Sequence, residues 1–106
     1  MYKDLFPLGS VVRLSGGEEA IMIVGRVASK AGEEKVYDYT GVPYPEGIAD
    51  TENMFFFDHE DIEEIDFIGC KNDLETEYRS GVLEKLDAVA PLVVRNGEIV
   101  PADIKG

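Results

Sequence analysis

The sequence contains no tryptophan, one cysteine and one histidine. Because Cys70 has no second cysteine, it cannot form an internal disulfide, and the fold must be stable without oxidation. His59 lies in the acidic turn Asp58-His59-Glu60-Asp61, and no cysteine or histidine in another segment matches it to complete a metal site. We therefore predict no catalytic residues, no metal and no cofactor, and we interpret this turn as solvated.

Long apolar runs are also missing. The longest run without an aromatic residue covers residues 20–24, whereas a helix that spans a bilayer needs roughly 20 apolar residues. The chain begins Met1-Tyr2-Lys3-Asp4 rather than with a basic segment followed by an apolar stretch. These features predict neither a signal peptide nor a membrane anchor, and they favour a cytoplasmic location.

Basic residues are few. Lysine and arginine number 10 against 22 aspartates and glutamates, which gives a net charge of −12. The imbalance is concentrated in residues 58–87, which hold 11 acids and 3 bases. Such a field repels phosphate backbones and anionic membrane surfaces, so we expect neither nucleic acid nor membrane as a partner. It accelerates encounter with a basic protein, although the same charge also serves solubility alone.

Five short segments are predicted strands, because they are rich in β-branched and aromatic residues and are bounded by turn residues. They are residues 10–14, 20–27, 36–42, 54–57 and 62–69. The first three are joined by short polar turns, which predicts an antiparallel meander. Gly25 inside the central strand predicts a bulge or a sharp bend, which a small barrel needs in order to close. In the fifth strand, simple alternation places Ile65 and Phe67 on one face.

One helix is predicted after these strands. Asn72 fits its N-cap, with Glu75 at the reciprocal capping position, and Pro91 ends it. Apolar residues recur along it every three or four positions: Leu74, Tyr78, Val82, Leu83, Leu86 and Val89. Gly81 in the middle costs roughly 1 kcal/mol relative to alanine.

These elements together predict an α+β fold in a single domain, residues 1–106. We expect a β-rich core over residues 5–70, in the form of a small antiparallel β-barrel or a strongly bent sheet of about five strands, similar to an SH3 domain. One amphipathic helix covers residues 72–90. Residues 91–106 form a hairpin or a tail, since Asn96-Gly97 between two apolar stretches is a strong hairpin signal.

Two sets of residues are candidates for binding another protein. They are the tyrosines Tyr37, Tyr39 and Tyr44, and the helix residues Leu74, Tyr78 and Val82. The segment Tyr37-Asp38-Tyr39 is similar to the tyrosine motif that lines the peptide groove of SH3 domains, although tyrosines also simply cover a sheet face. The helix stripe either packs on the chain's own sheet or contacts a partner. An exposed stripe or an edge strand can also pair two copies into a homodimer.

Several motifs occur in order along residues 5–70. They are Leu8-Gly9-Ser10-Val11-Val12-Arg13-Leu14-Ser15-Gly16-Gly17, Ile21-Met22-Ile23-Val24-Gly25-Arg26, Tyr37-Asp38-Tyr39, Tyr44-Pro45-Glu46-Gly47 and Phe57-Asp58-His59-Glu60-Asp61-Ile62. As a set they resemble a bacterial family known as domain of unknown function 4176. The sequence departs from that family at Gly69-Cys70, where a Gly-Tyr pair often ends the last matched strand.

The resemblance implies an accessory role in protein export. Such proteins occur in Gram-positive bacteria, mostly Firmicutes, near type VII secretion genes and LXG-type toxins. They are thought to bind the helical N-terminal region of the toxin before export. We therefore expect a non-catalytic chaperone or targeting factor for such a toxin. Two alternatives stay open, namely a peptide-binding module of the SH3 type and an immunity protein that neutralises a toxin.

Overall fold

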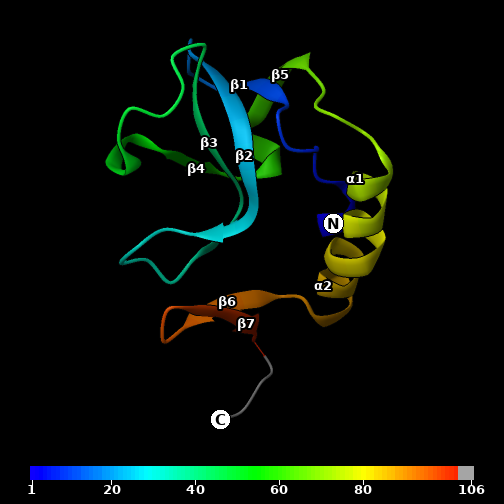
Figure 1. Ribbon diagram of the computed structural model, residues 1–106. Helices are drawn as coiled ribbons and strands as arrows, with labels where there is room; N and C mark the ends of the chain where they lie inside the picture. The colour runs from blue at the N-terminus through cyan, green and yellow to red at the C-terminus, as the bar shows by residue number, and fades with distance from the viewer. Residues whose placement is uncertain (103–106) are drawn as a thin grey trace.

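The computed structural model describes residues 1–102, apart from the side chain of Thr51. Five strands pair antiparallel in one sheet, in the order β4-β3-β2-β1-β5 (Figure 1). The strands are β1 (Val11–Leu14), β2 (Ala20–Ser29), β3 (Val36–Tyr44), β4 (Phe55–Phe57) and β5 (Ile62–Phe67). The predicted meander of the first three strands is confirmed, since β1 pairs with β2 and β2 pairs with β3. Strands β4 and β5 extend the sheet at its two edges.

The prediction of a barrel or a strongly bent sheet is wrong. Within residues 1–102 the edge strands β4 and β5 do not pair with each other, and the sheet is neither closed nor strongly curled. The three residues of β4 are too few to close a barrel, and β5 pairs with β1 through two register shifts. One shift places Ile65 beside Val12 and Phe67 beside Val11, so Ile65 and Phe67 lie on opposite faces, not on one face as predicted.

The predicted helix is one stretch of 17 residues in three parts. They are α1 (Asp73–Tyr78), a π-helical turn η4 (Arg79–Leu83) and α2 (Glu84–Val89). The side chain of Asn72 accepts a hydrogen bond from the amide of Glu75, which confirms the N-cap, and the helix ends just before Pro91. Within residues 1–102, no helix has both the length and the apolar character that crossing a membrane requires.

The C-terminal hairpin is also confirmed. It consists of β6 (Leu92–Arg95) and β7 (Glu98–Pro101), which form a separate two-stranded sheet. Asn96 and Gly97 between them have φ of 53° and 78°, as a tight hairpin turn requires. Residues 103–106 of the predicted hairpin or tail lie outside the described residues. Three short 3-10 turns complete the chain: η1 (Tyr2–Asp4), η2 (Thr51–Asn53) and η3 (His59–Asp61).

The hydrophobic core joins the five-stranded sheet, the N-terminal segment, the helix and the hairpin, and β5 reaches it through the partly buried Ile62. Its buried side chains are Val12, Ile21, Ile23, Tyr39 and Phe57 from the sheet, Tyr2 and Leu5 from the N-terminal segment, Leu83 from the helix and Leu92 from the hairpin. Burying a large apolar side chain contributes roughly 1.5–3 kcal/mol. The N-terminal segment therefore takes part in the core, and it runs between the sheet and the helix (Figure 1).

Gly25 lies at the predicted irregularity of β2. The pairing of β2 with β3 shifts by one residue between Ile23 and Gly25. A shift of one residue turns every later side chain to the opposite face of the sheet. Ile23 and Arg26 consequently both face the helix side, where regular alternation would separate them. A side chain at Gly25 would place Cβ 2.6 Å from Cγ2 of Thr40, so any larger residue here would force the Thr40 side chain to move.

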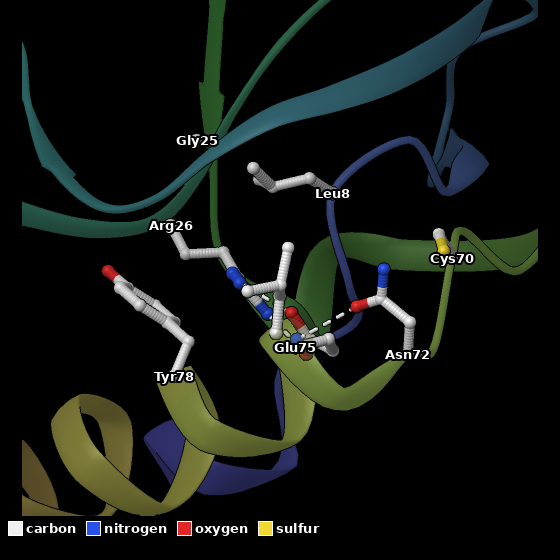
Figure 2. A pocket seen from close by; sticks show the side chains of 8 residues that line it. Leu8, Gly25, Arg26, Cys70, Asn72, Glu75 and Tyr78 are labelled. Atoms are coloured by element: carbon white, nitrogen blue, oxygen red, sulfur yellow. Dashed lines mark hydrogen bonds and ion pairs between the residues drawn. The ribbon is translucent and has the colours of Figure 1, made fainter.

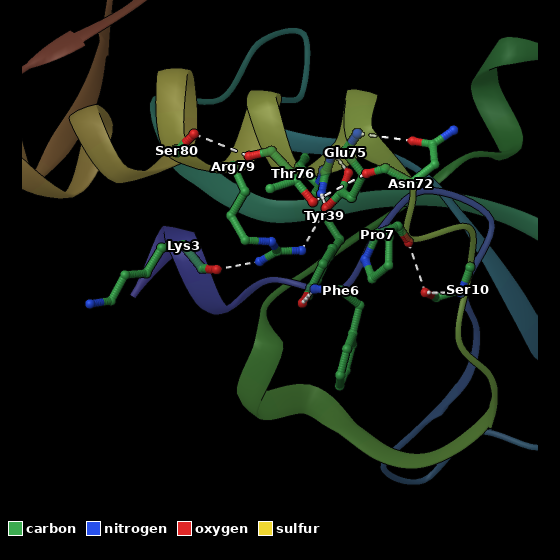
Figure 3. A network of polar contacts seen from close by, with 12 residues as sticks. Lys3, Phe6, Pro7, Ser10, Tyr39, Asn72, Glu75, Thr76, Arg79 and Ser80 are labelled. Carbon is green, nitrogen blue, oxygen red and sulfur yellow. Dashed lines mark hydrogen bonds and ion pairs between the residues drawn. The ribbon is translucent and has the colours of Figure 1, made fainter.

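Arg26 makes the central polar contact between sheet and helix. Its guanidinium donates to both carboxylate oxygens of Glu75 at 2.8 Å, and the two side chains are 5% and 11% exposed. Arg79 also donates to Glu75, at 2.6 Å, and to the carbonyl of Lys3 (Figure 3). The Arg26 guanidinium lies 5.0 Å from the ring centroid of Tyr78. One carboxylate thus connects β2, the helix and, through Arg79, the N-terminal segment.

Two helix carboxylates have roles that the sequence did not predict. Glu75 is turned inward to Arg26, so its expected reciprocal capping role is wrong. Asp87 caps η1, because its two oxygens accept the amides of Tyr2 at 2.6 Å and Lys3 at 3.0 Å. Burial alone would raise the pKa of Asp87, but the hydrogen bonds from Lys3 and Tyr2 outweigh it, and the pKa is lowered.

Replacing Glu75 tests the contact between helix and sheet. Glu75→Gln keeps the shape and the helix propensity but leaves the buried Arg26 without its counter-charge. We expect the free energy of unfolding to fall by roughly 2–4 kcal/mol, because removing one partner of a buried ion pair leaves the other charge uncompensated. Glu77→Gln, at an exposed position of α1, is the matched control and should change it by less than about 0.5 kcal/mol. Equal losses in urea denaturation would contradict this role of the ion pair.

The stability difference between wild type and Glu75→Gln should also depend on pH. The hydrogen bond from Arg26 holds the pKa of Glu75 below its ordinary value, although burial opposes this. A carboxyl group with a lowered pKa stabilises the fold above its unfolded-state pKa of about 4.3, and this contribution is lost as pH falls through the folded-state pKa. We expect a constant difference at about pH 6–8 that shrinks below roughly pH 4. A difference unchanged at about pH 3 would mean that Glu75 titrates normally in the fold.

Candidate functional site

The helix exposes the residues that the sequence predicts to bind a partner. Leu74, Tyr78 and Val82 are 74%, 41% and 39% exposed, and Val89 is 45% exposed. Leu83, from the same predicted stripe, is fully buried in the core. The single apolar stripe of the sequence is therefore divided between two faces of the helix. We call the exposed set, Leu74, Tyr78, Val82 and Val89, the outer stripe.

Charged residues on the inner face explain this division. Glu75 and Arg79 occupy the side of the helix that faces the sheet and the N-terminal segment, where Glu75 binds Arg26. A π-helical turn holds more residues than an α-helical turn, so η4 changes the angle at which the following side chains point. Leu83 rather than Val82 enters the core as a result.

A pocket of about 510 Å³ opens beside the N-terminal half of the outer stripe (Figure 2). Leu74 and Tyr78 line it from the helix, and Leu8, which is 46% exposed, lines it from the N-terminal segment. The ion pair between Arg26 and Glu75 forms its polar side. The pocket extends the apolar surface from the helix onto the neighbouring segment.

Tyr39 cannot line a peptide groove, because it is fully buried. Its ring lies 5.4 Å from that of Phe57, and its hydroxyl accepts the amide of Phe6 at 2.9 Å. The same hydroxyl lies 2.6 Å from Nδ1 of His59, where it donates its own hydrogen when that ring nitrogen is unprotonated. Burial raises the pKa of Tyr39 to about 12, so the hydroxyl stays protonated and links β3 to the N-terminal segment.

The other two tyrosines do not share a groove with Tyr39. Tyr37 is half-buried, its hydroxyl donates to Glu33 at 2.6 Å, and its ring lies 5.7 Å from that of Phe56. Tyr44 is 50% exposed and lines a different pocket. The predicted binding surface along the three tyrosines is therefore not formed.

The pocket at Tyr44 lies on the face of the sheet away from the helix and has a volume of about 640 Å³. Phe67, which is 60% exposed, forms another wall, and Val11 and Met22 also line it. The ion pair between Arg13 and Asp66, with an N–O distance of 2.9 Å, adds charge to its lining. Sequence reasoning did not find this groove, because it depends on the non-local pairing of β1 with β5.

The acidic turn around His59 is tied to β3 by its backbone. The amide of His59 donates to Asp38 at 2.9 Å, and the amide of Asp38 donates to Asp58 at 3.1 Å. Lys35 pairs with Asp58 at 2.8 Å. Burial raises the pKa of Asp38, which is half-buried. Among residues 1–102, no three His, Cys, Asp or Glu side chains gather closely enough to hold a metal ion.

Arg26 and Leu8 are the site residues that sequence reasoning missed. The role of Arg26 could have been predicted, because it is a lone charge in a central apolar strand, directly after the bulge glycine. Such a charge is turned toward the core and needs a partner of opposite charge there. No pattern in the sequence predicts the place of Leu8 beside the helix, since that place depends on how the N-terminal segment runs along the sheet.

Comparison with known proteins identifies the family but no characterised relative. A family model described as Domain of unknown function (DUF4176) matches residues 5–78. No curated protein and no solved structure matches the chain. The match spans the whole five-stranded sheet and α1, including Leu74 and Tyr78 of the outer stripe. The chain belongs to the family described as a domain of unknown function, DUF4176.

Proposed function

We propose that this chain is a non-catalytic accessory factor that binds another protein through the outer stripe. The observation that supports this function is the exposure of Leu74, Tyr78 and Val82 on a helix whose inner face already packs on its own core. Apolar side chains grouped on a surface are typical of protein–protein contacts. Covering them releases water and contributes about 25 cal/mol for each Å² of apolar surface that is buried.

The attachment of the helix supports a preformed binding surface. Glu75 is held by Arg26 and Arg79, and Asp87 is held by the amides of the N-terminal segment. The outer stripe is therefore presented on a fixed element. A partner that binds it avoids the entropy cost of ordering this helix at the moment of contact.

The partner class comes from the family resemblance. We propose that the partner is the helical N-terminal region of a type VII-secreted toxin of the LXG type, and that this chain acts in the cytoplasm as its chaperone or targeting factor. A client that is exported after synthesis exposes apolar surface in the meantime, and such surface promotes aggregation. A fixed apolar stripe that covers it is a physical means of keeping the client soluble.

Leu74→Asp tests this proposal. Leu74 is 74% exposed and is the second residue of α1, where a negative charge suits the helix dipole, so the fold should be kept. We expect co-purification with the N-terminal region of an LXG-type toxin encoded near its gene to fall at least about tenfold, because a charge replaces apolar contact.

The matched control is Ile48→Asp, which makes the same kind of change at a position 58% exposed in the connection between β3 and β4. It should leave co-purification unchanged, and circular dichroism should show both variants folded. Wild-type co-purification of Leu74→Asp, or no co-purification with the wild-type chain, would contradict the proposal.

A further inference from the structure

The chemistry of the outer stripe restricts which element of a partner can cover it. Resting on the proposed function, we infer that this element is an amphipathic α-helix with basic residues beside its apolar face, and that it crosses the outer stripe at Gly81. Three observations carry the inference: the absence of free backbone groups along a helix side, a glycine that the chain itself does not need, and acids beside the stripe.

The first observation selects a helix over an extended segment. The amides and carbonyls of a helix bond along its own axis, so its side offers no backbone partners. An extended segment laid on the outer stripe would bury unpaired N–H and C=O groups, each at a cost of about 1–3 kcal/mol. A helix satisfies its own backbone. The stripe from Leu74 to Val89 is about 22 Å long at 1.5 Å per residue, enough for several turns of such a partner.

Gly81 marks the point of closest approach. It is exposed within η4, and a Cβ atom placed on it would meet nothing within 4 Å. Packing within the described residues therefore does not require glycine, although glycine inside a helix costs roughly 1 kcal/mol relative to alanine. Two helices approach most closely where one lacks a side chain. The close approach of a partner backbone explains why position 81 is glycine, which the contacts within the chain do not explain.

The charges beside the stripe select a basic partner. Asp73 and Glu77 are exposed and precede Leu74 and Tyr78 by one position, which places them about 100° around the helix from those residues. Beside Leu74 and Tyr78 they favour lysine or arginine on the partner helix and disfavour acids, whereas the exposed Lys85 adds one positive charge beside Val82 and Val89. A second copy of this chain is disfavoured as the occupant, because two chains of net charge −12 would bring these acids together.

Two designed helical peptides test the inference. Both carry the same leucine stripe over roughly 20 residues, and the stripe is flanked by lysine in one and by glutamate in the other. In NMR titrations of the labelled full chain, the lysine peptide should shift the amides of Leu74, Tyr78 and Val82. It should bind at least about tenfold more tightly than the glutamate peptide, and its binding should weaken as salt is added.

Two variants separate binding from folding. Gly81→Ala should raise the stability of the chain, because alanine favours the helix. It should also lower the affinity for the lysine peptide roughly tenfold, because the added methyl group separates the two helices. These opposite signs are not expected of a glycine with a purely structural role. Glu77→Lys should lower the affinity for the lysine peptide by about three- to tenfold. Glu52→Lys, which makes the same change in net charge on η2, away from the helix, should leave its affinity unchanged (Figure 1).

The outcomes distinguish this inference from the proposed function. If both peptides bind the outer stripe equally well, the inference that the partner helix carries basic residues beside its apolar face is wrong. If Gly81→Ala binds the lysine peptide as tightly as the wild-type chain does, the inference that the helices cross at Gly81 is wrong. If neither peptide shifts the amides of the outer stripe, the inference that a helix covers this stripe is wrong. In each of these cases the co-purification experiment with Leu74→Asp still decides the proposed function independently.

Discussion

A buried guanidinium must meet a carboxylate, and Arg26 meets Glu75 across the boundary between sheet and helix. Leaving either charge unpaired in this position would cost several kcal/mol, so the pair determines which side of the helix faces the sheet. Leu74, one position before Glu75, then points about 100° away from that side. The orientation of the outer stripe is therefore a consequence of the ion pair, which exposes apolar residues that burial would otherwise favour.

The ion pair depends in turn on two local features of the chain. The bulge at Gly25 turns Arg26 to the helix side of the sheet, and Arg79 extends the network to the carbonyl of Lys3. Tyr39 makes a second link, because its hydroxyl accepts the amide of Phe6 (Figure 3). The N-terminal segment is thus fixed by polar contacts as well as by the burial of Tyr2 and Leu5. Together these contacts hold the helix on the sheet while the outer stripe stays exposed.

Local features of this fold could be predicted from the sequence, and non-local ones could not. The N-cap at Asn72, the hairpin turn at Asn96-Gly97 and the bulge at Gly25 follow from backbone preferences of single residues. The open sheet was missed because closure depends on whether β4 and β5 meet, which no local pattern encodes. Tyr39 and Glu75 were misjudged for the same reason, since their partners, Phe6 and Arg26, are distant in sequence. The outer stripe was found, but its separation from Leu83 required the ion pair and the π-helical turn.

Thiol accessibility measures the orientation of the helix most directly. Val82→Cys and Leu83→Cys, each in a Cys70→Ser background, place one thiol on neighbouring helix positions that are 39% and 0% exposed. We predict that the thiol at position 82 reacts with a small disulfide reagent nearly as fast as a free thiol. The thiol at position 83 should react at least about a hundredfold more slowly, because it becomes accessible only when the helix opens. Equal rates, or a faster reaction at position 83, would contradict a helix that buries its charged side and presents its apolar stripe to solvent.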